Sequence, residues 1–210
     1  MRDRGLRPPL PIVSDGAKGL IGAVEYVFSH ALRQRCTIHK MCNVPAKVSK
    51  DDQETVRAEF WRIFDIADPD IRPGQELVGT VQRRIDSFVA TWEAKYPAAM
   101  KAMATDRASR TTHLRFPVEH HKRIRHSNFI ERTFGETRRR AKVIGRFPSE
   151  KTCTSLVRAV LDRASRGWRG FTMTPAGLRC LHDLRRALLE PPTMIRENTN
   201  EIAETLTNAA

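Results

Sequence analysis

Residues 127–148 read SNFIERTFGETRRRAKVIGRFP and have the spacing of one long helix. Ser127 is a suitable N-cap, because its hydroxyl can accept a hydrogen bond from a free backbone N–H of the first turn. Gly145 and Pro148 predict where the helix ends. Side chains that recur every three or four positions predict one buried face, made of Ile130, Phe134, Thr137 and Ala141.

The two acids of this predicted helix have different surroundings. Glu136 has Arg132 at i−4, Arg139 at i+3 and Arg140 at i+4, so we expect its charge to be balanced within the helix. Glu131 has no cation three or four positions away. A carboxylate without a local partner is a candidate for binding a metal ion or a basic ligand group. The alternative is an ordinary exposed glutamate.

The charge of the chain favours a polyanionic partner. The sequence has 210 residues and a formal net charge of +13. Residues 107–146 contain twelve lysines and arginines and three glutamates, so this segment carries +9 of that charge. Nucleic acid is favoured over a membrane surface, because no long apolar stripe accompanies the basic side chains. The predicted DNA-binding residues are Lys122, Arg123, Arg125, Arg132, Arg138, Arg139, Arg140 and Lys142.

The sequence predicts no membrane partner. No run of 18 apolar residues exists, and residues 1–10 have no apolar segment of a secretory signal. We therefore expect the cysteines to be reduced thiols. They are Cys36, Cys42, Cys153 and Cys180.

The order of predicted elements gives an α/β fold class that is mostly helical by content. Residues 1–38 predict strand–helix–strand, with strands at 11–14 and 34–38 and a helix at 17–31. Residues 39–105 predict a helical insertion. Residues 106–190 predict a basic loop or short strand (106–126), followed by the helix with Glu131 and by C-terminal helices. Residues 191–210 predict a flexible tail. The other predicted helices are 39–48 (interrupted at Pro45), 51–67, 73–94, 98–104, 149–165 and 174–189.

Two carboxylates can meet in this arrangement. Asp15 follows the first strand, at the end where sites gather in α/β folds, and Glu131 lies on a helix that can pack against that sheet. Paired carboxylates suit Mg²⁺ (or Mn²⁺), because hard cations prefer oxygen ligands, and two such ions can drive phosphodiester cleavage. The alternative role for Asp15 is a helix N-cap.

Cysteine and histidine give a weaker metal signal. Cys36 and His39 form a C-x2-H pair, which Cys42 extends to C-x2-H-x2-C. A structural zinc site needs four ligands, and no second compact pair follows. The alternative is a small buried cysteine and a hydrogen-bonded histidine. We expect the remaining histidines of the basic segment to lie in a loop facing the polyanion: His120, His121 and His126.

Two groups of residues carry a resemblance to a known family. The first comprises residues 13–20 (VSDGAKGL), 33–39 (RQRCTIH), Asn43 and 46–48 (AKV). The second comprises residues 127–132 (SNFIER) and 138–148 (RRRAKVIGRFP). In this order they resemble the Mutator-type transposases of bacterial insertion sequences, and the resemblance covers most of residues 10–190.

The resemblance implies a DDE-type transposase with an RNase-H-like core and a helical insertion before the last acid. Asp15 resembles the second aspartate of the triad and Glu131 the glutamate, with Glu136 as the alternative, and Cys36 and His39 resemble the C-x2-H signature of the family. The implied cofactor is Mg²⁺ or Mn²⁺, and the implied partner is DNA, at transposon ends and target. A homo-oligomer in the bacterial cytoplasm, associated with the nucleoid, is also implied.

The sequence departs from the family at three points. Only Asp3 precedes Asp15, and it does not fit the first catalytic aspartate, which the family carries on a strand some tens of residues earlier. The amino-terminal DNA-binding region of the family has no counterpart, and Cys42 stands where the family usually has a basic residue. We therefore expect the C-terminal half of a transposase, truncated or a remnant, and inactive on its own. The alternatives are a non-catalytic DNA-binding or transposase-partner protein, and a zinc-stabilised helical module.

Overall fold

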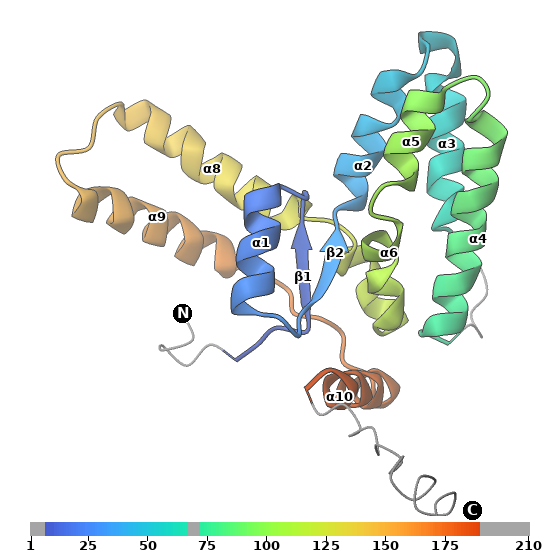
Figure 1. Cartoon of the computed structure of the whole chain (residues 1–210). Helices are drawn as coiled ribbons and strands as arrows, with labels where there is room; N and C mark the ends of the chain where they lie inside the picture. The colour runs from blue at the N-terminus through green and yellow to red at the C-terminus, as the bar shows by residue number, and fades with distance from the viewer. Residues whose placement is uncertain (1–6, 67–71, 190–210) are drawn as a thin grey trace, which may run out of the picture.

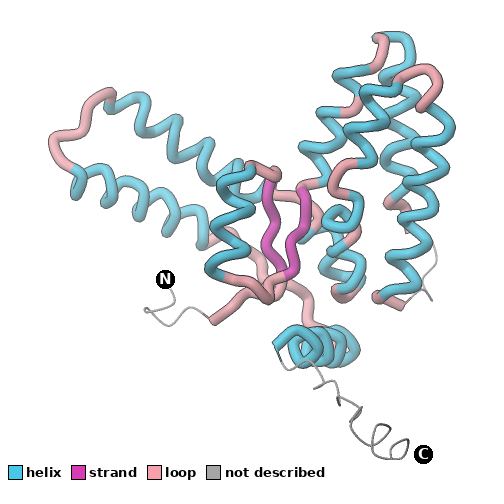
Figure 2. Tube along the Cα trace, in the orientation of Figure 1, coloured by secondary structure: helices cyan, strands magenta, loops and turns pink. Residues whose placement is uncertain are grey.

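The described part of the chain, residues 7–66 and 72–189 of a computed structural model, is mostly helical with one small two-stranded sheet. In Figure 1 the sheet stands between a block of helices, α2 to α5, and a hairpin of two long helices, α8 and α9. Figure 2 shows the same arrangement, with two short strands at the centre of a helical molecule. The predicted tail at residues 191–210 lies outside the described residues.

The sheet consists of two parallel strands, β1 (Pro11–Ser14) and β2 (Leu32–Arg35), paired from Pro11 with Leu32 to Ser14 with Arg35. Parallel strands need a crossover, and α1 (Lys18–Val27) provides it. The strand predicted at residues 11–14 is confirmed. The second strand was predicted too late in the chain, because Thr37 donates its N–H to the carbonyl of Arg125 at 2.9 Å instead of extending the sheet.

The main hydrophobic core lies within the helical block. Its elements are α2 (Thr37–Asn43), the 3₁₀ turns η2 (Pro45–Lys47) and η3 (Lys50–Asp52), α3 (Gln53–Ile63), α4 (Gln75–Trp92) and α5 (Pro97–Ala104). Phe60, Val81, Ile85 and Met100 are completely buried there. The predicted helices of this region are confirmed as helices, with ends that differ from the predicted ones by a few residues. The predicted end at residue 67 lies outside the described residues. The division of the chain into domains stays a prediction.

The basic segment 106–126 is neither a strand nor an open loop. It forms short helical turns: α6 (Arg107–Arg110), η4 (Thr112–Arg115), η5 (Val118–His120) and α7 (His121–Ile124). His113 lies at its centre, where its backbone N–H donates to Oε1 of the fully buried Gln34 at 2.8 Å. The expected polyanion-facing position is wrong for His120 and His121, which are buried and whose Nε2 atoms bond backbone carbonyls.

The last three helices are α8 (Asn128–Ile144), α9 (Glu150–Ser165) and α10 (Pro175–Leu189). Helices α8 and α9 form an antiparallel hairpin that projects away from the sheet (Figure 1). The predicted buried face of α8 is wrong, because Ile130 and Phe134 are 44% and 53% exposed. A two-helix hairpin covers each helix on one side only. Leu184 of α10 packs with Phe116 and Ile124 in a second, smaller core.

None of the helices in the described residues is both long and apolar enough to cross a membrane.

The buried His113 makes stability dependent on pH. Burial, with His121 and Arg125 nearby, lowers the pKa of His113 from 6.5 to about 3. The unfolded chain therefore takes up a proton that the folded chain excludes. Stability from this group is present above pH 6.5 and is lost as pH falls toward 3, by about 1.4 kcal/mol per pH unit.

We expect His113→Gln to flatten the decline of unfolding free energy between pH 6 and 4, roughly by that slope. Urea unfolding at several pH values measures it. His182→Gln, which removes an exposed histidine, is the control and should keep the wild-type slope. Parallel slopes for wild type and His113→Gln would contradict the assignment.

Candidate functional site

Asp15 lies directly after β1, at the carboxyl end of the sheet. Its side chain is exposed, and its Oδ1 accepts a hydrogen bond from the N–H of Ala17 at 3.0 Å. Asp15 thus stabilises the turn into α1, although the N-cap position itself belongs to Ala17. Oδ2 makes no hydrogen bond or ion pair to the part of the chain that the structure describes, so one oxygen of this carboxylate is available to a ligand.

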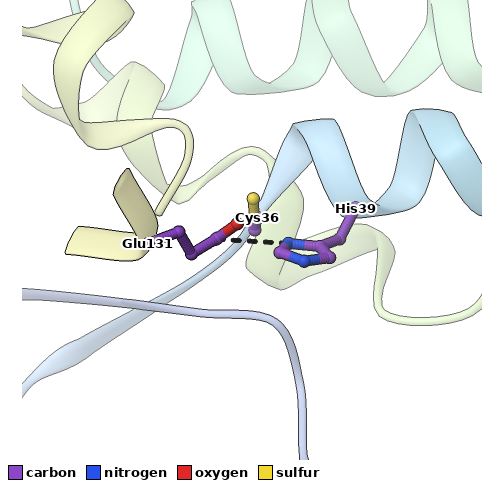
Figure 3. Close-up of side chains that lie close together, drawn as sticks. All are labelled: Cys36, His39 and Glu131. Atoms are coloured by element: carbon purple, nitrogen blue, oxygen red, sulfur yellow. Dashed lines mark ion pairs between the residues drawn. The ribbon is translucent and has the colours of Figure 1, made fainter. Parts of the chain in front are cut away.

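Glu131 lies beside the C-x2-H pair rather than alone. Cys36, the residue after β2, is completely buried, and His39 follows in the first turn of α2. Glu131 comes from the first turn of α8, and its Oε1 lies 3.7 Å from Nδ1 of His39. One ligand atom from each of the three residues lies within 4.8 Å of the others. Figure 3 shows the three side chains turned toward one another.

Backbone contacts hold these distant segments together. The carbonyl of Arg125 accepts both the N–H and the hydroxyl of Thr37, each at 2.9 Å. The N–H of Ser127 donates to Sγ of Cys36 at 3.4 Å. The chain just before α8 is therefore attached to the start of α2, and Glu131 arrives one helical turn later.

Ser127 has a role that the sequence argument missed. It occupies the predicted N-cap position of α8, but its side chain makes no cap hydrogen bond to the backbone. Its hydroxyl donates instead to Oε1 of Glu131. The signal was present in the spacing, because residues four apart on a helix are neighbours.

The cysteine and the histidine of the cluster have shifted pKa values. Burial opposes the Cys36 thiolate, but the polar groups of Ser127 and His39 around the sulfur outweigh it and lower the pKa of Cys36. The Cys36 side chain raises the pKa of His39, against partial burial, and the charges of Glu131 and Asp15 add to that rise. Asp15 is not one of the three clustered residues, yet it acts on the same imidazole.

The predicted basic residues fall into three environments. Arg139 and Arg140 pair with Glu136 at 2.9 and 2.7 Å, which confirms the expected balance within α8, and they lower the pKa of Glu136. Arg125 is half-buried with its guanidinium 5.3 Å from the centre of the Trp61 ring. The exposed members are Lys122, Arg123, Arg132, Arg138 and Lys142.

Gly16 holds the turn after Asp15 against the end of β2. Its φ of +88° is a conformation that favours glycine, and a Cβ placed there would lie 0.8 Å from Nη1 of Arg35. We expect Gly16→Ala to destabilise the protein by at least about 1 kcal/mol, because both the backbone and the guanidinium must move.

Thermal and urea unfolding measure this effect. Gly22→Ala, within α1 and with open space around its Cβ position, is the matched control and should stabilise by about 0.5–1 kcal/mol. Equal stability of Gly16→Ala and wild type would show that Arg35 does not need this glycine.

Comparison with known proteins identifies the family. Residues 1–170 match the family described as "Transposase, Mutator family". The chain is 30% identical over 172 residues to the transposase for insertion sequence element IST2 of Acidithiobacillus ferrooxidans, covering 81% of this chain and 55% of that protein. It is 31% identical over 166 residues to the transposase for IS6120 of Mycolicibacterium smegmatis, covering 79% and 49%.

A third relative is the transposase for IS256 in transposon Tn4001 of Staphylococcus aureus, 29% identical over 163 residues, covering 77% of this chain and 39% of that protein. The chain spans about half the length, or less, of these curated relatives. The resemblance that residues 13–48 and 127–148 carry in the sequence is confirmed by the match of the whole segment 1–170. The chain belongs to the Mutator family of transposases.

Proposed function

We propose that this chain contributes DNA binding and two metal-binding carboxylates, Asp15 and Glu131, to Mg²⁺-dependent DNA strand cleavage and transfer in transposition. Family membership supports the reaction class. In this proposal the parallel strand pair with its α1 crossover is part of an RNase-H-like core, and α2 to α5 are the insertion before the last acid. DNA as partner puts the protein at the bacterial nucleoid, and a homo-oligomer stays a prediction.

One observation carries the proposal: Asp15 and Glu131 both lie at the carboxyl end of the parallel strand pair. Asp15 follows β1 directly, and Glu131 lies beside Cys36, the residue after β2. Both charges raise the pKa of His39, although the two residues come from a strand end and from a helix far along the chain. In each carboxylate, one oxygen contacts the described residues: Oδ1 in Asp15 and Oε1 in Glu131. Oxygen donors of this kind fit Mg²⁺ or Mn²⁺.

When bound, Mg²⁺ would stabilise negative charge on the attacking and leaving oxygens of a phosphodiester. The protein's own part is to orient the carboxylates. Ser127 and His39 restrain Glu131 from two sides, while the turn at Ala17 restrains Asp15. Restraint of this kind keeps ligands in a productive geometry before the substrate arrives.

The α8 helix supplies the surface for DNA. Its first turn contains Glu131, and its 17 residues extend about 25 Å away from the sheet. Arg132, Arg138 and Lys142 are exposed along it and form no ion pair with the described residues. Such cations bind phosphates without reading the base sequence.

The metal site is tested by titrating the 210-residue chain with Mn²⁺ and following thermal unfolding and metal-bound fraction. We expect wild type to be stabilised, because a ligand of the folded state raises its stability by mass action. Asp15→Asn and Glu131→Gln should each lose that stabilisation.

Glu136→Gln is the control, because its carboxylate is engaged by Arg139 and Arg140 on the same helix. Equal Mn²⁺ binding by all four proteins would contradict the carboxylate pair. The chain would then fit better with the alternative, a non-catalytic DNA-binding or transposase-partner remnant.

DNA binding is tested by measuring affinity for a duplex over a range of salt concentrations. Arg132→Gln, Arg138→Gln and Lys142→Gln should each weaken binding and reduce the slope of log K against log salt by about 0.9. The control is Arg166→Gln, at the end of α9, whose guanidinium pairs with Asp162 at 2.9 Å. An equal loss in the control would mean that net charge, rather than α8, determines binding.

A further inference from the structure

The cluster in Figure 3 combines three different donor atoms. Cys36 offers sulfur, His39 a ring nitrogen and Glu131 a carboxylate oxygen, all within 4.8 Å of one another. Mg²⁺ prefers an all-oxygen environment, whereas a set with one thiolate and one imidazole suits a borderline-soft ion such as Zn²⁺. This donor set therefore differs in chemistry from the pair Asp15 and Glu131.

The geometry is close to what zinc requires. Tetrahedral ligands at about 2.0–2.3 Å from the ion lie roughly 3.3–3.8 Å from one another. Oε1 of Glu131 and Nδ1 of His39 are 3.7 Å apart, which is too long for a hydrogen bond but within that range. Small side-chain adjustments of Cys36 would complete three ligand positions.

An unsatisfied atom points to a missing partner. Nδ1 of His39 is buried and has no hydrogen-bond partner in the described structure. Buried polar atoms nearly always have a partner, and each exception calls for an explanation, such as an ion. A metal between Nδ1 and Glu131 would satisfy this nitrogen.

The surroundings are organised like the outer shell of a metal site. The N–H of Ser127 donates to the Cys36 sulfur at 3.4 Å, and its hydroxyl donates to Oε1 of Glu131. Outer hydrogen bonds of this kind orient metal ligands and tune their basicity. The negative charges of one thiolate and one carboxylate would balance a divalent cation.

The cluster is also accessible from one side. Cys36 is completely buried, but the side chains of His39 and Glu131 are 39% and 46% exposed. A cation can therefore reach the cluster from solvent, and a water molecule can take the fourth position.

From these observations we propose that Cys36, His39 and Glu131 bind one Zn²⁺-class cation. The ion connects the start of α2 to the first turn of α8. The site shares Glu131 with the proposed Mg²⁺ pair but does not depend on it, because Asp15 is not a ligand. While Zn²⁺ is bound, one Glu131 oxygen is occupied, so Zn²⁺ weakens Mn²⁺ binding at the Asp15–Glu131 pair.

The test uses the reduced 210-residue chain, dialysed against Zn²⁺ or Co²⁺. We expect one ion per chain and, with Co²⁺, the thiolate-to-metal absorption band in the near ultraviolet. Cys36→Ser should abolish that band, and His39→Ala should weaken binding by more than about 100-fold, since outer-shell partners alone are worth 10–100-fold. Cys42→Ser, an exposed cysteine of the same helix, is the matched control and should bind like wild type.

Two readouts keep the result decisive. Because Cys36 is buried, Cys36→Ser can fail to fold, and circular dichroism detects this. In that case the cobalt band of wild type and the metal affinity of His39→Ala, which changes a partly exposed side chain, decide the question. Asp15→Asn should keep Zn²⁺ while losing Mn²⁺, and Cys36→Ser or His39→Ala should show the reverse, which separates this site from the carboxylate pair. Absence of the band, or undiminished binding by His39→Ala, would mean an adventitious ion only and would overturn the proposal.

Discussion

The carbonyl of Arg125 accepts two hydrogen bonds from Thr37, and the rest of the candidate site depends on this contact. It joins residues 88 positions apart in the sequence. The bond from Ser127 to Cys36 adds a second link, two residues after Arg125. Together these bonds end the β2 strand, start α2 and determine where α8 begins. Glu131 meets His39 because its helix starts from this anchored position.

A second buried polar contact connects the sheet to the helical block. Gln34 of β2 accepts the N–H of His113 and donates to the carbonyl of Arg110, while Thr112 donates to the carbonyl of Arg33. A buried amide that lost these partners would cost roughly 1–3 kcal/mol. This requirement explains why segment 106–126 folds into tight turns over β2, although its composition is typical of an exposed basic loop.

The same helix serves the site and the basic surface. The N-terminal turn of α8 presents Glu131 to the sheet, and its later turns carry Arg138 and Lys142 outward along the hairpin. Glu136 neutralises part of that charge by pairing with Arg139 and Arg140. In the proposed function, a phosphate backbone bound along α8 would therefore run toward the carboxylates rather than away from them.

Local pattern determined much of this protein. Apolar spacing located the long helices and the β1 strand at 11–14, and the spacing of charges predicted the balance around Glu136. Both succeeded because helix periodicity and i,i+4 pairing act within a few residues. It failed for the face of α8 with Ile130 and Phe134, since periodicity indicates an apolar face but not whether another element covers it.

The sequence by itself determined the family, the helical content and the candidate residues Asp15, Cys36, His39 and Glu131. Only the tertiary structure decided that Glu131 meets Cys36 and His39, that Ser127 bonds Glu131 instead of capping α8, and that His120 and His121 are buried. The physical reason is that these contacts join residues many positions apart, and no spacing along the chain encodes which backbone carbonyl a distant side chain will reach.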